Sequence, residues 1–151
     1  MAQVIRIESH IDEFTDEMKQ KVEAFLEGIG ASAASAAADI PNFPVDTGRL
    51  KGSINWATHR TSGSGDSPKD VPEENSVYIG TNVDYAIWHE IGTGEYASQG
   101  GGRQGGWAFK DKHGNWHRTN GVPARHFIQY GAQSNWNSGL KSQLEQILKQ
   151  E

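Results

Sequence analysis

Residues 11–29 read IDEFTDEMKQKVEAFLEGI, and apolar side chains recur among them at intervals of three and four residues. This spacing places the apolar side chains on one face of an α-helix. Acidic residues fill the early turns, where the helix dipole favours negative charge. The alanine-rich segment that follows, up to Ala38, has a high helix propensity, and Pro41 stops the helix. The sequence therefore predicts a long amphipathic N-terminal helix.

The segments around this helix predict short strands and a second helix. Residues 4–7 form a strand or an arm, while residues 54–61 and 76–81 read as two paired strands. Beyond Pro123 a second long helix is expected, with these residues on its apolar side: Phe127, Leu140, Leu144, Ile147 and Leu148. The order predicts an α+β fold, in which a long N-terminal and a long C-terminal helix pack a mainly antiparallel sheet. A single domain over residues 1–151 fits this length.

Glycine is concentrated in one part of the chain, since nine of the eighteen glycines lie in residues 92–121. This composition predicts a long glycine-rich loop, in which residues 107–109 and 115–117 form an aromatic hairpin around a tight turn. Residues 62–75 and 93–106 lack apolar anchors. We expect both to be flexible loops, because little offsets the entropy of ordering them.

Charge is unevenly distributed along the chain. The net charge is -5 overall, about -5 in residues 1–40 and about -6 in residues 62–100, but about +4 in residues 101–125. A basic loop on an acidic body suits either an acidic protein neighbour or DNA. Because the acidic body would repel DNA, a protein partner is the favoured interpretation.

Several classes of site are excluded or disfavoured. The chain has no cysteine, which excludes disulfides and thiol chemistry, and no apolar run long enough to span a bilayer. His113 and His117 resemble a metal pair or a nuclease motif, but Asp111 is the nearby carboxylate and no cluster surrounds them. No catalytic, cofactor-binding or metal site is predicted, and no cofactor.

The tryptophans are more informative. For Trp56 and Trp88 we expect packing in the core, whereas tryptophans inside a glycine-rich loop are costly on the surface of a monomer. Aromatic side chains beside Arg and Lys are typical of interface cores, and packing within the hairpin is the alternative. The candidate interface residues are Arg103, Trp107, Phe109, Lys110, Trp116 and Arg118.

Three segments, in this order, resemble a known family: PVDTGRL at 44–50 with Ser53-Ile54; Tyr78-Ile79-Gly80-Thr81 with Tyr85-Ala86 and Glu90-x-Gly92-Thr93; and Trp107 and Trp116 leading into Pro123-Ala124-Arg125-His126-Phe127-Ile128. The family is the minor tail-component, or tail-completion (head–tail joining), family of long-tailed double-stranded DNA phages and prophages. The similarity covers roughly residues 10–148. One departure is His126, where relatives often carry proline.

The resemblance implies a structural virion protein and no enzyme activity. Such a subunit is a monomer when free and forms a ring around the DNA channel on assembly. Its partners are further copies and other phage neck and tail proteins; no membrane is involved, and DNA is only passing cargo. It is located in the neck or tail of the virion, and in the host cytoplasm during assembly. A tail terminator or head-closure protein is one alternative. An accessory DNA-binding or nuclease-like protein that uses residues 101–125 is another.

The resemblance also assigns structural roles to six residues: Asp46, Thr47 and Gly48, which set a turn, and Tyr85, Glu90 and Gly92, which fix a short helix against the sheet. Glu90 is expected to pair with Arg49 or with a backbone amide. The local sequence predicts Asp84 as the N-cap of this helix, and Gly92 as its end in the left-handed conformation.

Overall fold

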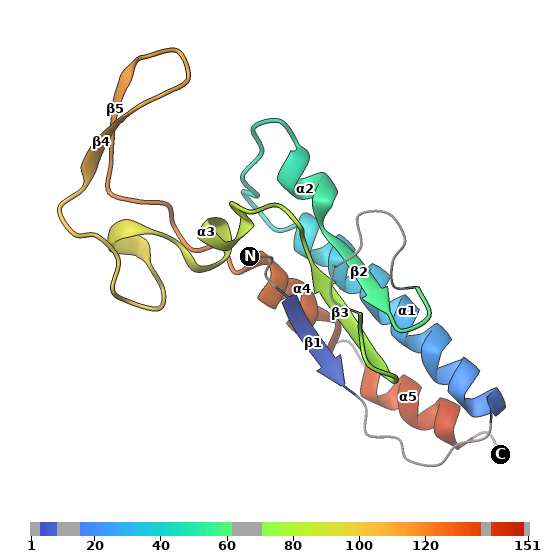
Figure 1. The fold of residues 1–151 in the computed structure, drawn as a ribbon. Helices are drawn as coiled ribbons and strands as arrows, with labels where there is room; N and C mark the ends of the chain where they lie inside the picture. The colour runs from blue at the N-terminus through green and yellow to red at the C-terminus, as the bar shows by residue number, and fades with distance from the viewer. Residues whose placement is uncertain (1–3, 9–15, 62–70, 137–139, 150–151) are drawn as a thin grey trace.

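Helix α1 (Asp16–Ala38) is the longest element of the structure and lies along one face of a small sheet (Figure 1). The computed structural model describes residues 4–8, 16–61, 71–136 and 140–149. The buried side chains of α1 follow the helical spacing: Met18, Val22, Leu26, Ile29, Ala33 and Ala37. The long N-terminal helix is therefore present from Asp16 onward. Residues 11–15 of the predicted helix lie outside the described residues.

Three antiparallel strands make the sheet: β1 (Val4–Glu8), β2 (Asn55–Thr58) and β3 (Ser76–Gly80). Their order is β1-β3-β2, so β3 is central and pairs with both neighbours. Val77 and Ile79 of β3 are fully buried against α1. The predicted pairing of residues 54–61 with residues 76–81 is confirmed as the pair β2–β3, although β2 is shorter than residues 54–61.

The segment predicted as a second long helix contains α4 (Phe127–Trp136) and α5 (Leu140–Leu148). The three residues between them, 137–139, lie outside the described residues. The α+β class with small antiparallel sheets is confirmed, but packing by one long C-terminal helix is not.

Helices α1 and α4 approach each other closely at Gly131. A Cβ atom built at Gly131 would overlap the carbonyl oxygen of Ala33 and lie 2.7 Å from the Cβ of Ala37. At the start of α4, Phe127 is fully buried and meets the Phe43 ring edge-on at 5.3 Å. The core thus depends on small residues where the two helices cross.

Two short helices and a projecting hairpin complete the structure. After the short helices α2 (Arg49–Ser53) and α3 (Ala86–Ile91), the chain makes a 3-10 turn, η1 (Gly94–Tyr96), and a hairpin of β4 (Trp107–Lys110) and β5 (Trp116–Thr119). The hairpin projects away from the helices and the main sheet (Figure 1). We call residues 93–122 the arm and the other described residues the body. The predicted aromatic hairpin is confirmed.

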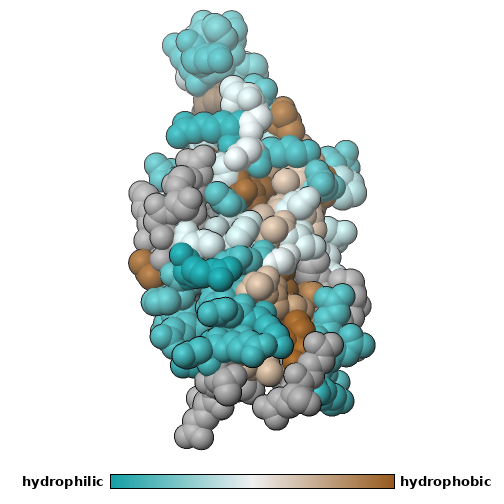
Figure 2. Space-filling model, turned by 90° about the vertical axis from the view of Figure 1, so that its right-hand side faces the viewer, coloured by the Kyte–Doolittle hydropathy of each residue, from teal (hydrophilic) through white to brown (hydrophobic). Residues whose placement is uncertain are grey.

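Polar side chains cover much of the body. The face in Figure 2 has hydrophilic atoms along its edges, with hydrophobic atoms exposed between them. Among the described helices, none combines the length and the apolar character that crossing a bilayer requires.

The helix crossing gives a stability prediction. We expect Gly131→Ala to lower the free energy of unfolding by about 2 kcal/mol, because overpacking outweighs the gain in helix propensity. Gly28→Ala is the matched control, since Gly28 is exposed on α1 and has open space around its Cβ position. It should raise stability by about 0.5–1 kcal/mol. Urea unfolding curves measure the free energy of unfolding of both variants. Equal changes in the two variants would contradict the close approach of α1 and α4 at Gly131.

Candidate functional site

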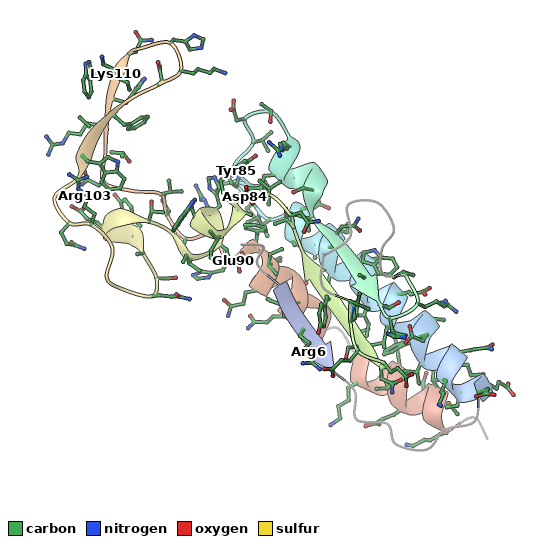
Figure 3. The ribbon with its side chains drawn as sticks, viewed as in Figure 1. Arg6, Asp84, Tyr85, Glu90, Arg103 and Lys110 are labelled. Atoms are coloured by element: carbon green, nitrogen blue, oxygen red, sulfur yellow. The ribbon has the colours of Figure 1, made fainter. Side chains whose placement is uncertain are left out.

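Glu90 joins helix α3 to the start of helix α4. Its side chain is buried, and its carboxylate accepts hydrogen bonds from the backbone N–H groups of Ile128 at 2.9 Å and Gln129 at 3.1 Å. The first N–H groups of a helix have no partner within the helix, and the helix dipole favours a negative charge there. The carboxylate of Glu90 therefore caps α4 from a distant segment (Figure 3). Of the two expected pairings, the structure shows the backbone amides and places Arg49 elsewhere, on the surface.

Gly92 directs the chain from α3 into the arm. Its φ is 77° and its ψ is 169°, a combination that is essentially restricted to glycine. A Cβ here would overlap the carbonyl oxygen of Tyr96 and lie 2.8 Å from the amide nitrogen of Ala124. The expected left-handed helical end is wrong, because the extended ψ sends the chain alongside residues 122–124.

The base of the arm is closely packed backbone. The N–H of Thr93 donates to the carbonyl of Val122, and the N–H of Glu95 donates to that of Asn120, both at 2.9 Å. The Glu95 carboxylate accepts from the N–H of Gly105 at 3.0 Å and from the amide side chain of Asn120 at 3.1 Å. Four glycines occupy positions where a Cβ would collide with backbone or side-chain atoms of this base: Gly94, Gly102, Gly106 and Gly121. These glycines allow backbone segments at the base of the arm to pack in direct contact. This role differs from the flexibility expected for residues 93–106.

The arm carries the six candidate interface residues in two groups. Three of them pack near the base: Trp107 is half-buried beneath the guanidinium of Arg103, at 5.5 Å, and Arg118 donates to the carbonyl of Gly105. The others point outward. Trp116 is 68% exposed, with the Lys110 ammonium 5.0 Å from its ring centre, and Phe109 is 44% exposed.

Asp111 organises the turn at the end of the hairpin. One carboxylate oxygen accepts from the N–H groups of His113 at 2.8 Å and Asn115 at 2.9 Å. The other oxygen lies 2.8 Å from Nε2 of His117. The hydrogen bond with His117, followed by those from the backbone, holds the pKa of Asp111 below its usual value. Within the described ranges, no three His, Asp or Glu side chains converge as metal ligands.

A hollow opens on the body beside α2 and α3. It has a volume of about 660 Å³ and is lined by residues 44–50, Tyr85 and His89. Burial and the nearby Arg125 lower the pKa of His89. Gly48, with φ 79°, precedes α2, and the N–H of Arg49 donates to the Thr47 hydroxyl at 3.3 Å. Thr47 and Gly48 thus lie in the expected turn, and Asp46 is exposed beside them.

Two expectations about α3, those for Trp88 and Asp84, are wrong. Trp88 is 53% exposed, so it does not fill the core. Tyr85, expected to fix the helix against the sheet, is 39% exposed. The buried side of α3 consists of Ala86 and Glu90, and residues 85 and 88 lie on its other side. Asp84 is exposed and does not cap the helix, which begins after Tyr85 without a side-chain cap.

Sequence reasoning missed a pair of hydroxyl groups that ties α2 to the end of β3. The Ser53 hydroxyl donates to the carbonyl of Leu50 at 2.7 Å and lies 2.5 Å from the Thr81 hydroxyl. Because Ser53 has one hydroxyl hydrogen, Thr81 supplies the hydrogen between them. The Thr81 oxygen in turn accepts from the N–H of Val83 at 3.1 Å. Both residues lie inside the motifs quoted for the family resemblance, and this position was the signal that the sequence offered for the pair.

Comparison of the chain with protein-family models found no match, and comparisons with curated proteins and with solved structures found none either.

The Glu90 cap predicts a large effect of a small substitution. Glu90→Gln should lower the free energy of unfolding by about 2 kcal/mol, because an amide group removes the charge and turns one acceptor into a donor facing an N–H. Glu74→Gln, at an exposed position, is the control and should change stability by less than about 0.5 kcal/mol. Thermal unfolding monitored by circular dichroism compares the stability of the two variants. If the stability of Glu90→Gln equals that of the unmodified chain, the cap contributes little.

The arm base gives a second prediction, on amide hydrogen exchange. The N–H groups of Thr93, Glu95 and Val122 donate to fixed acceptors, so they should exchange at least ten-fold more slowly than that of Lys112 in the hairpin turn. Exchange followed by NMR on the free chain measures each amide. Equal, fast exchange throughout residues 93–106 would instead support the flexible loop that the composition suggests.

Proposed function

We propose that this chain is a structural virion protein of a long-tailed phage or prophage, a tail-completion or head–tail joining subunit that assembles into a ring in the neck. The observation that carries this proposal is the arm. Its outer half presents Trp116 and Phe109 to solvent, on a hairpin that its own body leaves uncovered. Aromatic side chains beside cations are typical of the centre of protein interfaces.

The charge distribution supports assembly from identical subunits. Residues 101–125 carry a net charge of about +4 and contain most of the arm, whereas residues 1–40 and 62–100 are strongly acidic. In a closed ring each subunit presents one surface to the next subunit and a different surface to the previous one. A basic arm meeting an acidic body satisfies this requirement and favours a defined register.

The motif residues fit a role in maintaining the fold. Ser53 and Thr81 tie α2 to the sheet, while Glu90 ties α3 to α4. In the proposed role these residues hold the arm in place, and the chain acts by assembly, without enzyme activity or a cofactor. Its partners are further copies and other neck and tail proteins, and the DNA only passes through the ring.

The proposal predicts separate effects on folding and on joining. Trp116→Ala should leave the melting temperature unchanged, because the side chain is 68% exposed, yet lower the joining of heads to tails by about 30-fold, as expected for an interface hot spot of 2 kcal/mol. Tyr130→Ala, an exposed aromatic on the body, is the control and should join normally. Heads and tails that lack the protein are mixed with each variant, and infectious particles are counted.

Two other results would contradict the proposed role of the arm. Normal joining by Trp116→Ala, with loss of joining when residues 140–151 are deleted, would move the interface to the last helix. A salt-dependent DNA gel shift that needs Lys110 and Trp116, together with normal joining, would favour the accessory DNA-binding role.

A further inference from the structure

A second hollow on the body lies beside the start of helix α4. It has a volume of about 450 Å³, and its lining includes Arg125, His126, Gln129 and Gln133. Gln129 and Gln133 stand four residues apart on α4, so their amide side chains lie on the same face of the helix. Among the described residues that line it, none is Asp, Glu or Lys. We call this cavity the α4 hollow.

The side chain of Arg125 has no acceptor in the part of the chain that the structure describes. Its Nε atom is buried without a hydrogen bond, and no described carboxylate forms an ion pair with its guanidinium. The backbone around it is fixed, because the N–H of Arg125 donates to the carbonyl of His89 at 2.7 Å and the N–H of His126 donates to that of Glu90 at 3.1 Å. A charged group that is shielded from water and has no acceptor is costly, which indicates a partner outside the described chain.

Two carboxylates belong to residues that adjoin the lining, and both have other partners. The carboxylate of Glu90 is buried and accepts hydrogen bonds from two backbone N–H groups of α4. The carboxylate of Asp39 lies 3.4 Å from the Lys51 ammonium. Neither carboxylate lines the hollow, so the guanidinium of Arg125 is the charge that an occupant would meet there.

The charge of Arg125 also acts on His89 of α3. Burial, and after it the nearby guanidinium of Arg125, lowers the pKa of His89. A guanidinium paired with a carboxylate would have a much smaller effect on a neighbouring imidazole, because the two charges offset each other. His89 therefore reports on whether Arg125 has an anionic partner.

We propose that the α4 hollow is an anion-binding site that takes a carboxylate group. The guanidinium of Arg125 supplies a positive charge and a planar set of N–H donors, which match the two oxygens of a carboxylate. The amides of Gln129 and Gln133 add neutral donors. One guanidinium suits a single negative charge, whereas a nucleic-acid backbone would bring further charges against a chain whose net charge is -5. The site does not depend on the proposed role in head–tail joining.

Titration of the full-length protein with sodium acetate, followed by NMR, tests the site. Acetate should shift the Nε–H signal of Arg125 and the side-chain amide signals of Gln129 and Gln133 in a saturable way. Sodium chloride at the same ionic strength should not. Equal responses to acetate and chloride would overturn the inference. A saturable response to sodium phosphate, with none to acetate, would overturn the assignment to a carboxylate.

The pKa of His89, followed by its ring-proton signals, gives a second reading. A bound carboxylate offsets the charge of Arg125, so the pKa of His89 should rise toward its ordinary value when acetate saturates the site. Asp46 and Arg49, which line the other hollow with His89, are present with and without acetate and do not account for a difference. If the amide signals shift while the pKa of His89 stays the same, acetate binds away from Arg125 and the inference is wrong.

Matched glutamate substitutions locate the site. Gln133→Glu places a carboxylate inside the hollow, where it competes for Arg125, and should weaken acetate binding at least ten-fold. Gln143→Glu makes the same chemical change at an exposed position on α5, beyond the far end of α4 (Figure 1), and should leave acetate binding unchanged. Equal weakening by both would show that only the overall charge matters and would overturn the inference. Arg125→Gln should abolish the saturable response.

Protein concentration distinguishes two sources of the carboxylate. If an acidic side chain of a second copy supplies it, concentrating the protein without acetate should shift the same three side-chain signals, and added acetate should dissociate the copies. If the signals respond to acetate but not to protein concentration, the carboxylate belongs to a different molecule. Both results keep the site, and the second excludes the second copy as its occupant.

Discussion

The carboxylate of Glu90 sets the relation between the two parts of the molecule. A buried charge is costly unless hydrogen bonds replace its water, and here two N–H groups at the start of α4 provide them. The backbone of the same residue accepts from His126, and the arm begins only a few residues later, at Thr93. One side chain thus fixes where α4 starts, how α3 lies against it and from which point the arm departs. The core contact between α4 and α1 at Gly131 follows from that placement.

Glycine in this chain serves close contact between backbone segments. Composition alone treats a glycine-rich segment as flexible, because glycine has the largest conformational entropy to lose. The partners that hold the arm base are almost thirty residues apart in sequence, as with Thr93 and Val122. No local pattern reports such pairs, so the sequence could not distinguish a loose loop from a packed base. Asp111, by contrast, stands in a short turn motif with Gly114 and Asn115, a signal that could have been recognised.

The elements that the sequence predicted are those in which a regular spacing of apolar residues repeats several times. Helix α1 has about six turns of regular spacing, and β3 carries Val77 and Ile79 two residues apart on its buried face, so both were identified. Helix α3 has only six residues, too few for periodicity to reveal which side is buried. For that reason Trp88 was assigned to the core although its side chain is 53% exposed. The partners of Glu90 were narrowed to two choices, and three-dimensional packing was needed to select the backbone amides.

The ordered base of the arm is compatible with the proposed assembly of free monomers into a ring. A hairpin tip buries little area, and interfaces well below about 1,000 Å² are usually weak. The base of the arm is already ordered by Glu95 and its partners, so binding does not have to order it again. In the proposed assembly, two isolated copies would meet only transiently. Several copies gathered at one site would hold each arm near its partner at a high effective concentration. The exposed aromatic residues of the arm are therefore compatible with a chain that stays apart in solution and associates only where its neighbours are held in place.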